Sequence, residues 1–305
     1  MRLEPHRRRR WLLLVAVVVV VVGVGGLFVA RAVSSPSVTP GTVAMPDLPW
    51  PSDGQAAAEV EGLGSLGSSG TRTPVPIASV TKVMTAYVVL HDHPLSADEQ
   101  GPTITVDVQA QDEAESAAST EESTVQVVAG QRLTERQLLE LMLIPSGNNI
   151  ARLLARWDAG SEDAFVPKMN ATAASLGMRQ TTYTGASGVE DSTTSTASDQ
   201  LILARAALGN DAIASIVNLR GIRIHGVPGT IINTNTLLGQ DGVIGLKTGS
   251  TSAAGGALMW AARTNDHVIV GVVLYQQPGG SPNAGLAAAL DASRKLIVGI
   301  ENALH

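Results

Sequence analysis

Four consecutive arginines, residues 7–10, precede a run of apolar residues, 11–30, that holds no charged side chain. A run of about 20 apolar residues is long enough to cross a bilayer as a helix. Flanking arginines stay on the cytoplasmic side, which places the C-terminal bulk of the chain outside. The alternative is a cleaved signal peptide with Ala30-Arg31-Ala32 as its cleavage site, although the apolar part of such peptides usually covers only about 7–15 residues. We expect residues 1–31 to be a membrane anchor, or otherwise a signal segment, and the protein to be exported: a single-pass protein of the cell membrane, or secreted if the segment is cleaved.

The next segment, residues 32–54, contains five prolines among Ser, Thr and Gly. Such a composition predicts a semi-extended spacer that holds a domain away from the membrane. We expect the folded domain to cover residues 55–305, a length of roughly 250 residues that can bury one large or two small cores.

Composition excludes several kinds of chemistry. The chain has no cysteine, so disulfides, thiol catalysis and thiolate metal sites are impossible. Beyond residue 31 it carries 15 basic and 26 acidic side chains, and binding of nucleic-acid phosphates needs clustered Lys and Arg. His91-Asp92-His93 is more typical of a helix end than of a metal site, because no third ligand follows in a suitable motif. We therefore expect no nucleic-acid partner, no metal and no cofactor.

The hydrophobic pattern changes twice along the domain. An early strand and turn precede a helix that is apolar on most sides, which is typical of a helix buried in a core. A block of helices follows, and after residue 219 the pattern returns to strands and one last helix, which predicts an α+β fold rather than regular βαβ units. The expected segments are strands at 56–66, 222–224, 256–263 and 267–275, and helices at 78–90, 134–144, 148–157, 161–176 and 283–304.

Four local features complete this prediction. Residues 103–109 and 123–128 are rich in Val, Ile and Thr and predict two short strands. The six acids between positions 107 and 122 indicate a solvated surface loop. Thr134 and Gln137 form a capping box, and Ser198-Asp199 is expected to cap a later helix. The glycine-rich stretch 62–70 lacks a phosphate-binding motif and is expected to be a hairpin turn.

A serine and a lysine three residues apart, Ser79 and Lys82, stand at the head of the buried helix. Residues at this spacing share a helical face. A serine hydroxyl becomes a good nucleophile only when a base accepts its proton, and a lysine can be that base if burial or a neighbouring cation keeps it neutral. A capping serine beside an unrelated lysine is the plain alternative, because this spacing is expected about once by chance in such a chain.

Two further motifs lie downstream. Ser146-Gly147-Asn148 falls between two predicted helices, where a loop can direct a hydroxyl and an amide towards a common site. Lys247-Thr248-Gly249 is followed by Ser250 and sits on a predicted strand edge. A cation and a hydroxyl there can hold a carboxylate, and the glycine lets a substrate backbone approach. The three motifs occur in the order that serine acyl-enzymes of the penicillin-recognising kind show.

The segments Ala78-Ser79-Val80-Thr81-Lys82-Val83-Met84-Thr85, Pro145-Ser146-Gly147-Asn148 and Gly245-Leu246-Lys247-Thr248-Gly249 resemble the serine-type D-alanyl-D-alanine carboxypeptidases, which are low-molecular-mass penicillin-binding proteins. The likeness covers about residues 55–305. It implies a β-lactamase/transpeptidase-like fold: an antiparallel sheet flanked by helices, beside an all-helical lobe.

The resemblance also implies a reaction. Ser79 would attack the D-Ala-D-Ala bond of a peptidoglycan stem peptide, neutral Lys82 would take its proton, and Ser146 would relay a proton to the leaving D-alanine. Water would then release the shortened peptide, and β-lactams would be covalent inhibitors trapped at the acyl stage.

Substrate binding is implied for the remaining motif residues. Asn148 would orient groups, and Lys247 would supply positive charge together with Thr248 and Gly249. The backbone N–H groups of Ser79 and Ser250 would form the oxyanion hole.

Two departures from the family pattern concern binding. Many relatives carry an arginine before the Lys-Thr-Gly motif that grips the substrate carboxylate, and Thr234 occupies that place here; Arg220 and Arg223 are the candidates to replace it. Relatives also often have an acid after the Ser-x-Asn motif, where this chain has Asn149.

Two alternatives share the same three motifs. A class A-like β-lactamase needs a glutamate with a nearby asparagine to activate the deacylating water, and Glu190 lies at a loosely similar distance without that context. A non-catalytic protein that binds penicillins or wall peptides has no need of a desolvated lysine. The motifs therefore favour the carboxypeptidase.

Overall fold

The computed structural model describes residues 47–120 and 122–305. The expected membrane segment and most of the proline-containing spacer lie outside the described residues. Within the described part, no single helix is long and apolar enough to cross a membrane; one pair, Ala197–Leu208 and Asp211–Val217, which is bent by 103°, passes by length and composition alone.

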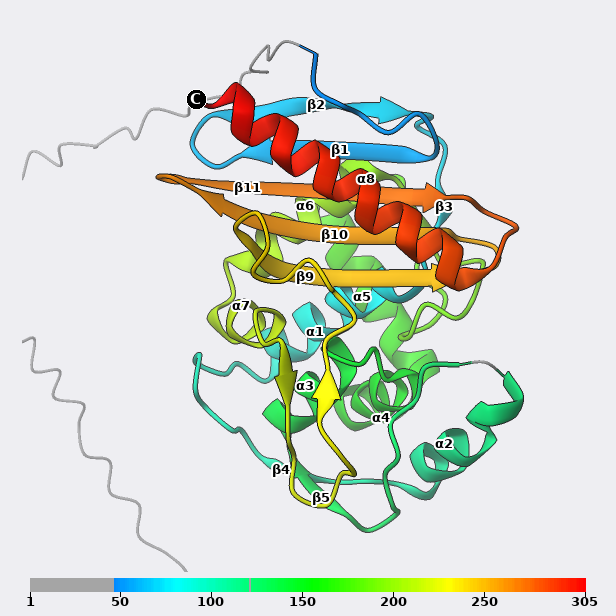
Figure 1. The fold of residues 1–305 in the computed structure, drawn as a ribbon. Helices are drawn as coiled ribbons and strands as arrows, with labels where there is room; N and C mark the ends of the chain where they lie inside the picture. The colour runs from blue at the N-terminus through cyan, green and yellow to red at the C-terminus, as the bar shows by residue number, and fades with distance from the viewer. Residues whose placement is uncertain (1–46, 121) are drawn as a thin grey trace, which may run out of the picture. The chain divides into compact units, whose positions relative to one another are not determined.

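Five antiparallel strands form the central sheet, in the order β2-β1-β11-β10-β9 (Figure 1). The N-terminal hairpin β1–β2 pairs with the C-terminal strand β11, so the sheet joins the two ends of the domain. This confirms the predicted antiparallel sheet in an α+β fold. The elements are β1 (Gln55–Val60), β2 (Gly64–Gly70), β9 (Val243–Thr251), β10 (Gly255–Thr264), β11 (His267–Gln276) and the last helix, α8 (Pro282–Ala303).

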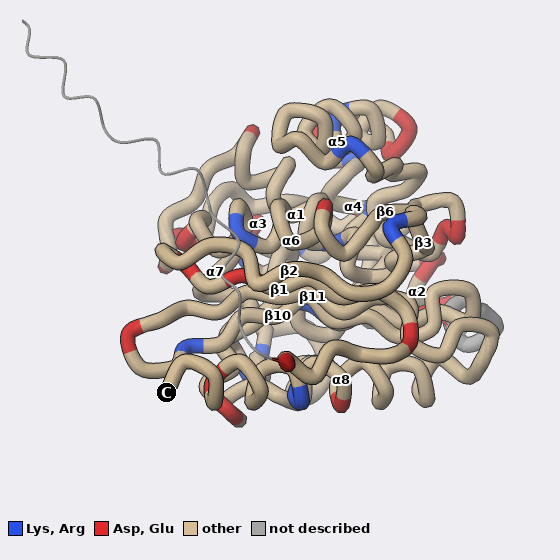
Figure 2. The backbone as a smooth tube through the Cα atoms, turned by 90° about the horizontal axis from the view of Figure 1, so that it is seen from above, with Lys and Arg blue, Asp and Glu red and all other residues tan. Residues whose placement is uncertain are grey.

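Helices cover both faces of this sheet, α8 on one side and α1 and α6 on the other (Figure 2). Alternate residues of β10 enter two separate cores: Ala257 and Met259 join the larger core, while Leu258, Trp260 and Ala262 join the core beneath α8. Side chains alternate across a strand, so a strand segment buried on both faces is apolar throughout, as residues 255–262 of β10 are.

The larger core is built around α1, of which nine of the twelve residues are buried. Helix α1 packs against α3, α4, α5 and α6. In Figure 1 helices α2, α3 and α4 lie beyond the β9 edge of the sheet. The helices are η1 (Ala78–Val80), α1 (Thr81–Asp92), α2 (Val108–Thr120), α3 (Glu135–Leu143), α4 (Asn148–Ala159), α5 (Glu162–Leu176), α6 (Ala197–Leu208) and α7 (Asp211–Val217).

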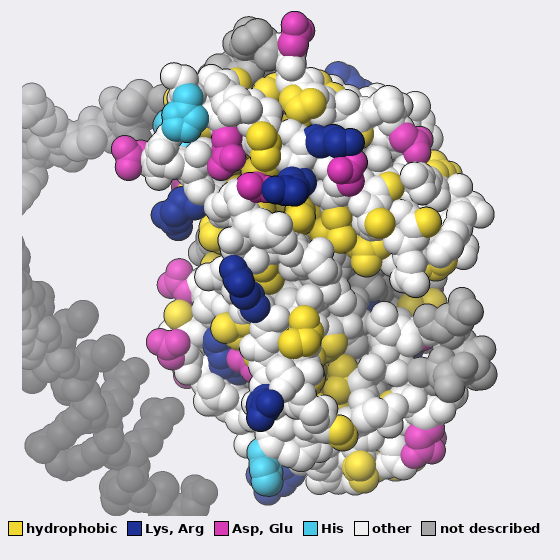
Figure 3. Space-filling view, viewed as in Figure 1, with side chains coloured by type: hydrophobic (Ala, Val, Ile, Leu, Met, Phe, Trp, Pro, Cys, Tyr) yellow, Lys and Arg dark blue, Asp and Glu magenta, His cyan; other side chains and the backbone are white. Residues whose placement is uncertain are grey.

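Three two-stranded sheets tie the loops together. They pair β3 (Val75–Pro76) with β6 (Thr194–Ser195), β4 (Thr103–Thr105) with β5 (Arg132–Thr134), and β7 (Gly221–Ile222) with β8 (Ile231–Ile232). On the face seen in Figure 3, Lys and Arg side chains lie singly among acidic and uncharged ones.

The acidic stretch is a helix, and its prediction as a solvated loop is wrong. After the short β4 the chain turns into α2, whose first turn is capped by Asp107 Oδ1, which accepts from Ala110 N at 2.8 Å. Acids of this stretch pair with arginines of α4, because α2 packs against that helix. The pattern of charges along the chain could not show where their partners would lie.

Three other local predictions need correction. Residues 123–128 form no strand; Val125 N instead donates to Asn149 Oδ1 at 3.0 Å. The cap of α6 is Thr196, whose side chain accepts from Asp199 N, rather than Ser198-Asp199. The turn of the first hairpin ends by residue 63, and residues 64–70 form β2. The Thr134–Gln137 capping box of α3 is confirmed.

Packing also begins before the sheet. Leu48 is buried in the core beneath α8, and Trp50 packs against the same core. The last residues of the segment expected to be a spacer therefore contact the domain.

Candidate active site

Ser79 lies in the short helix η1, where the chain enters the buried helix α1. This turn is tightly enclosed. Gly188, at φ +82°, packs so close to Ala78 that a Cβ there would overlap the Ala78 carbonyl oxygen. On the other side, a Cβ on Gly249 would lie 3.1 Å from Ser79 N. Both glycines allow neighbouring backbone to approach the serine more closely than a residue with a side chain would permit.

Lys82 is fully buried one turn after Ser79. Its Nζ lies 2.8 Å from Ser79 Oγ, 2.6 Å from Asn148 Oδ1 and 2.7 Å from the Ser187 carbonyl oxygen. Asn148 Oδ1 and the carbonyl can only accept hydrogen bonds. In the neutral amine they take its two N–H groups, which leaves its lone pair available to the serine hydroxyl.

Burial also favours the neutral amine. Desolvation holds the pKa of Lys82 well below its ordinary value, and the charges of Lys247 and Arg152 lower it further, while Glu190 and Glu122 oppose them. A lysine depressed in this way can act as a general base near neutral pH. The geometry and the electrostatics thus agree on a base beside a hydroxyl.

The loop between α3 and α4 contributes Ser146, and the first residue of α4 is Asn148. Ser146 is buried, and its φ of +70° is a backbone conformation that residues other than glycine seldom adopt. Asn148, two residues further on, contacts Lys82 directly. The next residue, Asn149, does not face the lysine: its amide donates to the Val125 and Ala110 carbonyl oxygens at 2.9 and 3.0 Å. Asn149 therefore fastens the segment after α2 to α4.

The third motif lies on β9, the edge strand beside η1. Lys247 is 1% exposed, and burial lowers its pKa to about 7. Its Nζ donates to the Thr248 carbonyl oxygen at 3.0 Å. Desolvation is the only resolved cause of this pKa shift, so an arriving carboxylate would restore the charge of the lysine.

Thr234 stands beside this motif, where many relatives have an arginine. Its hydroxyl is 2.5 Å from that of Thr248. The two arginines considered as replacements point elsewhere: Arg223 donates to Thr230 at 2.7 Å, and the Arg220 guanidinium packs against Gly239. The Thr248 hydroxyl lies 3.4 Å from Lys247 Nζ, and the Thr234 hydroxyl lies beside it.

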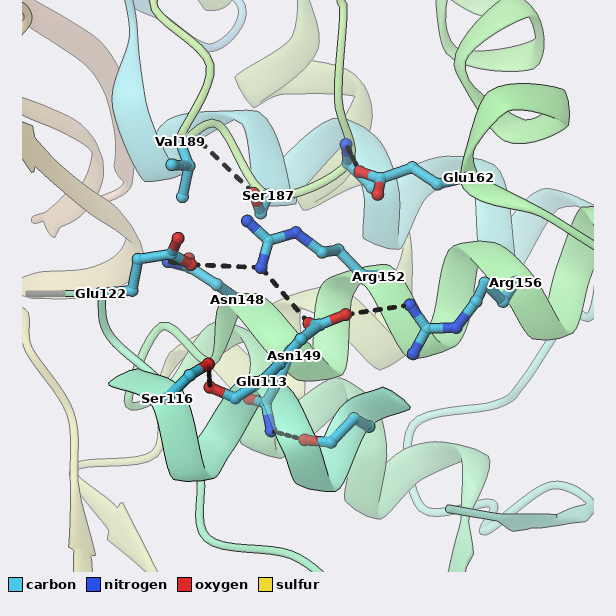
Figure 4. A network of polar contacts seen from close by, with 12 residues as sticks. Glu113, Ser116, Glu122, Asn148, Asn149, Arg152, Arg156, Glu162, Ser187 and Val189 are labelled. Carbon is cyan, nitrogen blue, oxygen red and sulfur yellow. Dashed lines mark hydrogen bonds and ion pairs between the residues drawn. The ribbon is translucent and has the colours of Figure 1, made fainter. Parts of the chain in front are cut away.

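Two contributors were not recognised in the sequence. One is the Ser187 carbonyl, which accepts from Lys82. The other is Glu122, whose Oε2 lies 3.2 Å from Asn148 Nδ2 (Figure 4). A backbone acceptor, and one acid among the six between positions 107 and 122, carry no sequence signal for such roles.

Among the described residues no group of three or more His, Cys, Asp or Glu side chains could hold a metal ion. His93 stacks on Trp157 and lies 3.2 Å from Asp158. Within the described chain, Glu190 Oε2 is buried without a hydrogen-bond partner.

Comparison with known proteins gives this geometry a family context. The profile of the Peptidase S11 family, described as D-alanyl-D-alanine carboxypeptidase, matches residues 66–277. D-alanyl-D-alanine carboxypeptidase DacB2 of Mycobacterium tuberculosis is 34% identical over 241 residues, which cover 77% of this chain and 78% of the relative. A D-alanyl-D-alanine carboxypeptidase of Streptomyces sp. (strain K15) is 31% identical over 64% of this chain and 71% of its own.

The fold is similar as well. The crystal structure of the Streptomyces K15 DD-transpeptidase superposes with a TM-score of 0.70 at 25% identity, covering 84% of this chain and all of that one. The sheet with its helices is thus the DD-transpeptidase fold. From the match of sequence profile, relatives and fold, the chain belongs to the peptidase S11 family of D-alanyl-D-alanine carboxypeptidases.

Proposed function

We propose that this protein is a serine D,D-carboxypeptidase that removes the terminal D-alanine from peptidoglycan stem pentapeptides. The observation that carries the proposal is the contact between Lys82 Nζ and Ser79 Oγ, with the other two partners of the lysine both acceptors. When Lys82 is neutral, as its lowered pKa favours, its two N–H groups serve these two acceptors and its lone pair can take the serine proton, which is what nucleophilic catalysis requires.

The reaction begins with acylation. Ser79 Oγ attacks the carbonyl carbon of the penultimate D-alanine while its proton passes to Lys82. Negative charge develops on the carbonyl oxygen, where the backbone N–H groups of Ser79 and Ser250 stabilise it. The C–N bond then breaks, and the proton held by Lys82 passes through Ser146 to the leaving amine, which returns Lys82 to its neutral form.

Deacylation completes the cycle. Water attacks the ester carbon and gives a proton to the neutral Lys82; Lys82 then passes this proton to the ester oxygen, which departs as the Ser79 hydroxyl. A β-lactam acylates Ser79 in the same way, but its leaving amine stays attached through the opened ring. We therefore expect β-lactams to label the protein covalently.

Binding of the terminal carboxylate falls to β9. Lys247 supplies the charge, and the hydroxyls of Thr248 and Thr234 supply hydrogen-bond donors in place of an arginine. Charge-assisted hydrogen bonds of this kind are stronger than neutral ones. Asn148 orients the substrate as well as Lys82, and Gly249 allows its backbone to approach.

The test is direct. The detergent-solubilised full-length protein should release D-alanine from a pentapeptide ending in D-Ala-D-Ala, and Ser79→Ala should abolish release. Release that survives this substitution would refute the mechanism. Transfer of the acyl group to an added amine instead of water would assign the transpeptidase reaction.

A class A-like β-lactamase is the second candidate, because the buried, unpartnered oxygen of Glu190 acts on Lys82 electrostatically. The same preparation distinguishes them. A fluorescent penicillin should stay bound to a carboxypeptidase for many minutes, whereas rapid release of hydrolysed penicillin identifies a β-lactamase. A non-catalytic binder would retain the label and release no D-alanine.

We further propose, from the apolar run at 11–30, that the protein is anchored in the cell membrane with its catalytic domain on the extracytoplasmic face. Cell fractionation tests this: the full-length protein should sediment with membranes and should be cut by protease added to spheroplasts. Recovery of a shortened protein from the medium would show a cleaved signal peptide instead.

A further inference from the structure

Asn148 is the side chain through which α4 reaches Lys82, and its amide has two different faces. Its Oδ1 lies 2.6 Å from Lys82 Nζ, and its Nδ2 lies 3.2 Å from Glu122 Oε2. A half-turn of the amide would set its NH₂ group against the amine and its oxygen against a carboxylate. The contact with the carboxylate would become repulsive, and the amide would donate to the lysine lone pair instead of accepting from its N–H group, so Glu122 selects the orientation that presents an acceptor to the lysine.

Glu122 is itself held in place by a chain of charges (Figure 4). Arg152 Nη1 lies 3.1 Å from the same Oε2 atom and 3.3 Å from Glu113 Oε2. Arg156 continues the chain, 3.3 Å from Glu113 Oε1 and joined to Asp107 by two bonds of 2.8 and 2.9 Å.

This network is not an ordinary surface feature. The side chains of Arg152 and Glu122 are 15% and 22% exposed, so solvent screens them less than freely exposed pairs. It spans from α2 to α4 and ends on the amide that contacts Lys82. Glu122, fixed at the end of this network, therefore supports the active site from outside the three sequence motifs.

We propose that Glu122 is a positioning residue for the Lys82 base: by accepting from Asn148 Nδ2 it fixes the amide that directs the lysine lone pair at Ser79. The inference rests on the proposed function, because it concerns the acylation step. It assigns to Glu122 no contact with substrate.

Glu122 also acts through its charge, and the two effects can be separated. Its carboxylate raises the pKa of Lys82, as does Glu190, against burial, Lys247 and Arg152. Loss of the Glu122 charge alone should therefore lower the pKa of Lys82. Loss of the hydrogen bond to Asn148 alone should slow acylation and leave the pKa of Lys82 unchanged.

Two conservative substitutions make the separation. Glu122→Asp keeps the charge but withdraws the carboxylate from Asn148, whereas Glu122→Gln keeps an acceptor within reach but removes the charge. Glu115→Gln is the matched control, since Glu115 is an exposed acid of α2 whose side chain accepts from Gln111. Second-order rates of acylation by a fluorescent penicillin are measured for the full-length protein from pH 5 to 9.

We expect Glu122→Asp to lower the maximal acylation rate about tenfold, the effect of one charge-assisted hydrogen bond. The pH at which the acylation rate rises should be the same as in the unsubstituted protein. Glu122→Gln should stay within about threefold of the unsubstituted rate, with the rise moved to lower pH. Glu115→Gln should match the unsubstituted protein. Thermal unfolding of each variant checks that the fold is retained.

Two results would overturn the inference. One is a Glu122→Asp rate equal to that of the unsubstituted protein; the other is a Glu122→Gln rate as low as that of Glu122→Asp, because orientation would then not be what the residue contributes. Failure of the unsubstituted protein to be labelled at Ser79 is a different outcome, which refutes the proposed function and this inference with it.

Discussion

A buried carboxyl group outside the candidate active site gives the sharpest stability prediction. Glu135 begins α3 and is inaccessible to solvent, and neither of its oxygens has a hydrogen-bond partner within the described residues. Burial raises its pKa to about 7, and the charges of Glu99 and Asp158 act in the same direction. The folded protein therefore favours the neutral acid.

The sign of the pH dependence follows from this shift. In the unfolded chain the carboxyl titrates near its ordinary pKa of 4.5, so the folded state binds the proton more tightly. Its contribution to the free energy of unfolding is fully present below about pH 4.5 and is lost as the pH rises through about 7. At about 1.4 kcal/mol per tenfold change in the protonation equilibrium, the loss amounts to up to about 3 kcal/mol by pH 8.

Glu135→Gln removes the titration while keeping the shape of the side chain. We expect the variant to match the unsubstituted protein at pH 4.5 and to be more stable by up to about 3 kcal/mol at pH 8. Urea unfolding of the detergent-solubilised protein at pH 4.5, 6, 7 and 8 measures the difference. Other acids with raised pKa values, such as Glu140 and Glu113, are present in both proteins and cancel.

The control is Glu115→Gln, which removes an exposed carboxylate and should leave the pH dependence of unfolding unchanged. Parallel stability curves for the unsubstituted protein and Glu135→Gln would refute the reasoning. They would mean that Glu135 is ionised in the fold without cost, through water or a movement of the Gly101 loop against which it packs.

Two further predictions concern the site. Lys247 has a pKa of about 7 when burial alone acts on it, so its charge is lost as the pH rises. We expect kcat/KM for a substrate with a free carboxylate to fall above about pH 7, and a Lys247→Arg variant, which stays charged, to lose that alkaline decline; an unchanged decline would assign it to another group. Gly188→Ala places a Cβ against the Ala78 carbonyl at a positive φ. It should destabilise the fold by about 2 kcal/mol or more and slow labelling by penicillin. The control is Gly177→Ala, at a positive-φ helix cap with open space around it, which should destabilise the fold without slowing labelling.

Segments with a strong hydrophobic period were predictable. The buried helix after Ser79 and the strands β10 and β11 were recognised because each is apolar over enough residues to define its period. The capping box at Thr134 depends on two side chains three residues apart, which the sequence shows directly. Local rules suffice where the partners are local.

Prediction was wrong where the partners are distant. The acids at 107–122 were predicted to form a solvated loop because their ion-pair partners, Arg152 and Arg156, lie some 30 to 50 residues further along the chain. Residues 123–128 have the composition of a strand, yet Asn149 binds the backbone of Val125 with its side chain. Composition could not distinguish pairing with a strand from attachment to an amide.

The sequence by itself determined the kinds of residue available for chemistry: a serine three residues before a lysine, a Ser-Gly-Asn loop and a Lys-Thr-Gly strand in a fixed order. Only the tertiary structure decided how they act together. Burial of Lys82 lowers its pKa, and acceptors from two other segments, Asn148 and the Ser187 carbonyl, direct its lone pair at Ser79. A pKa depends on all surrounding charge and solvent, and a hydrogen bond on positions within about 3 Å, so neither exists until the chain has folded.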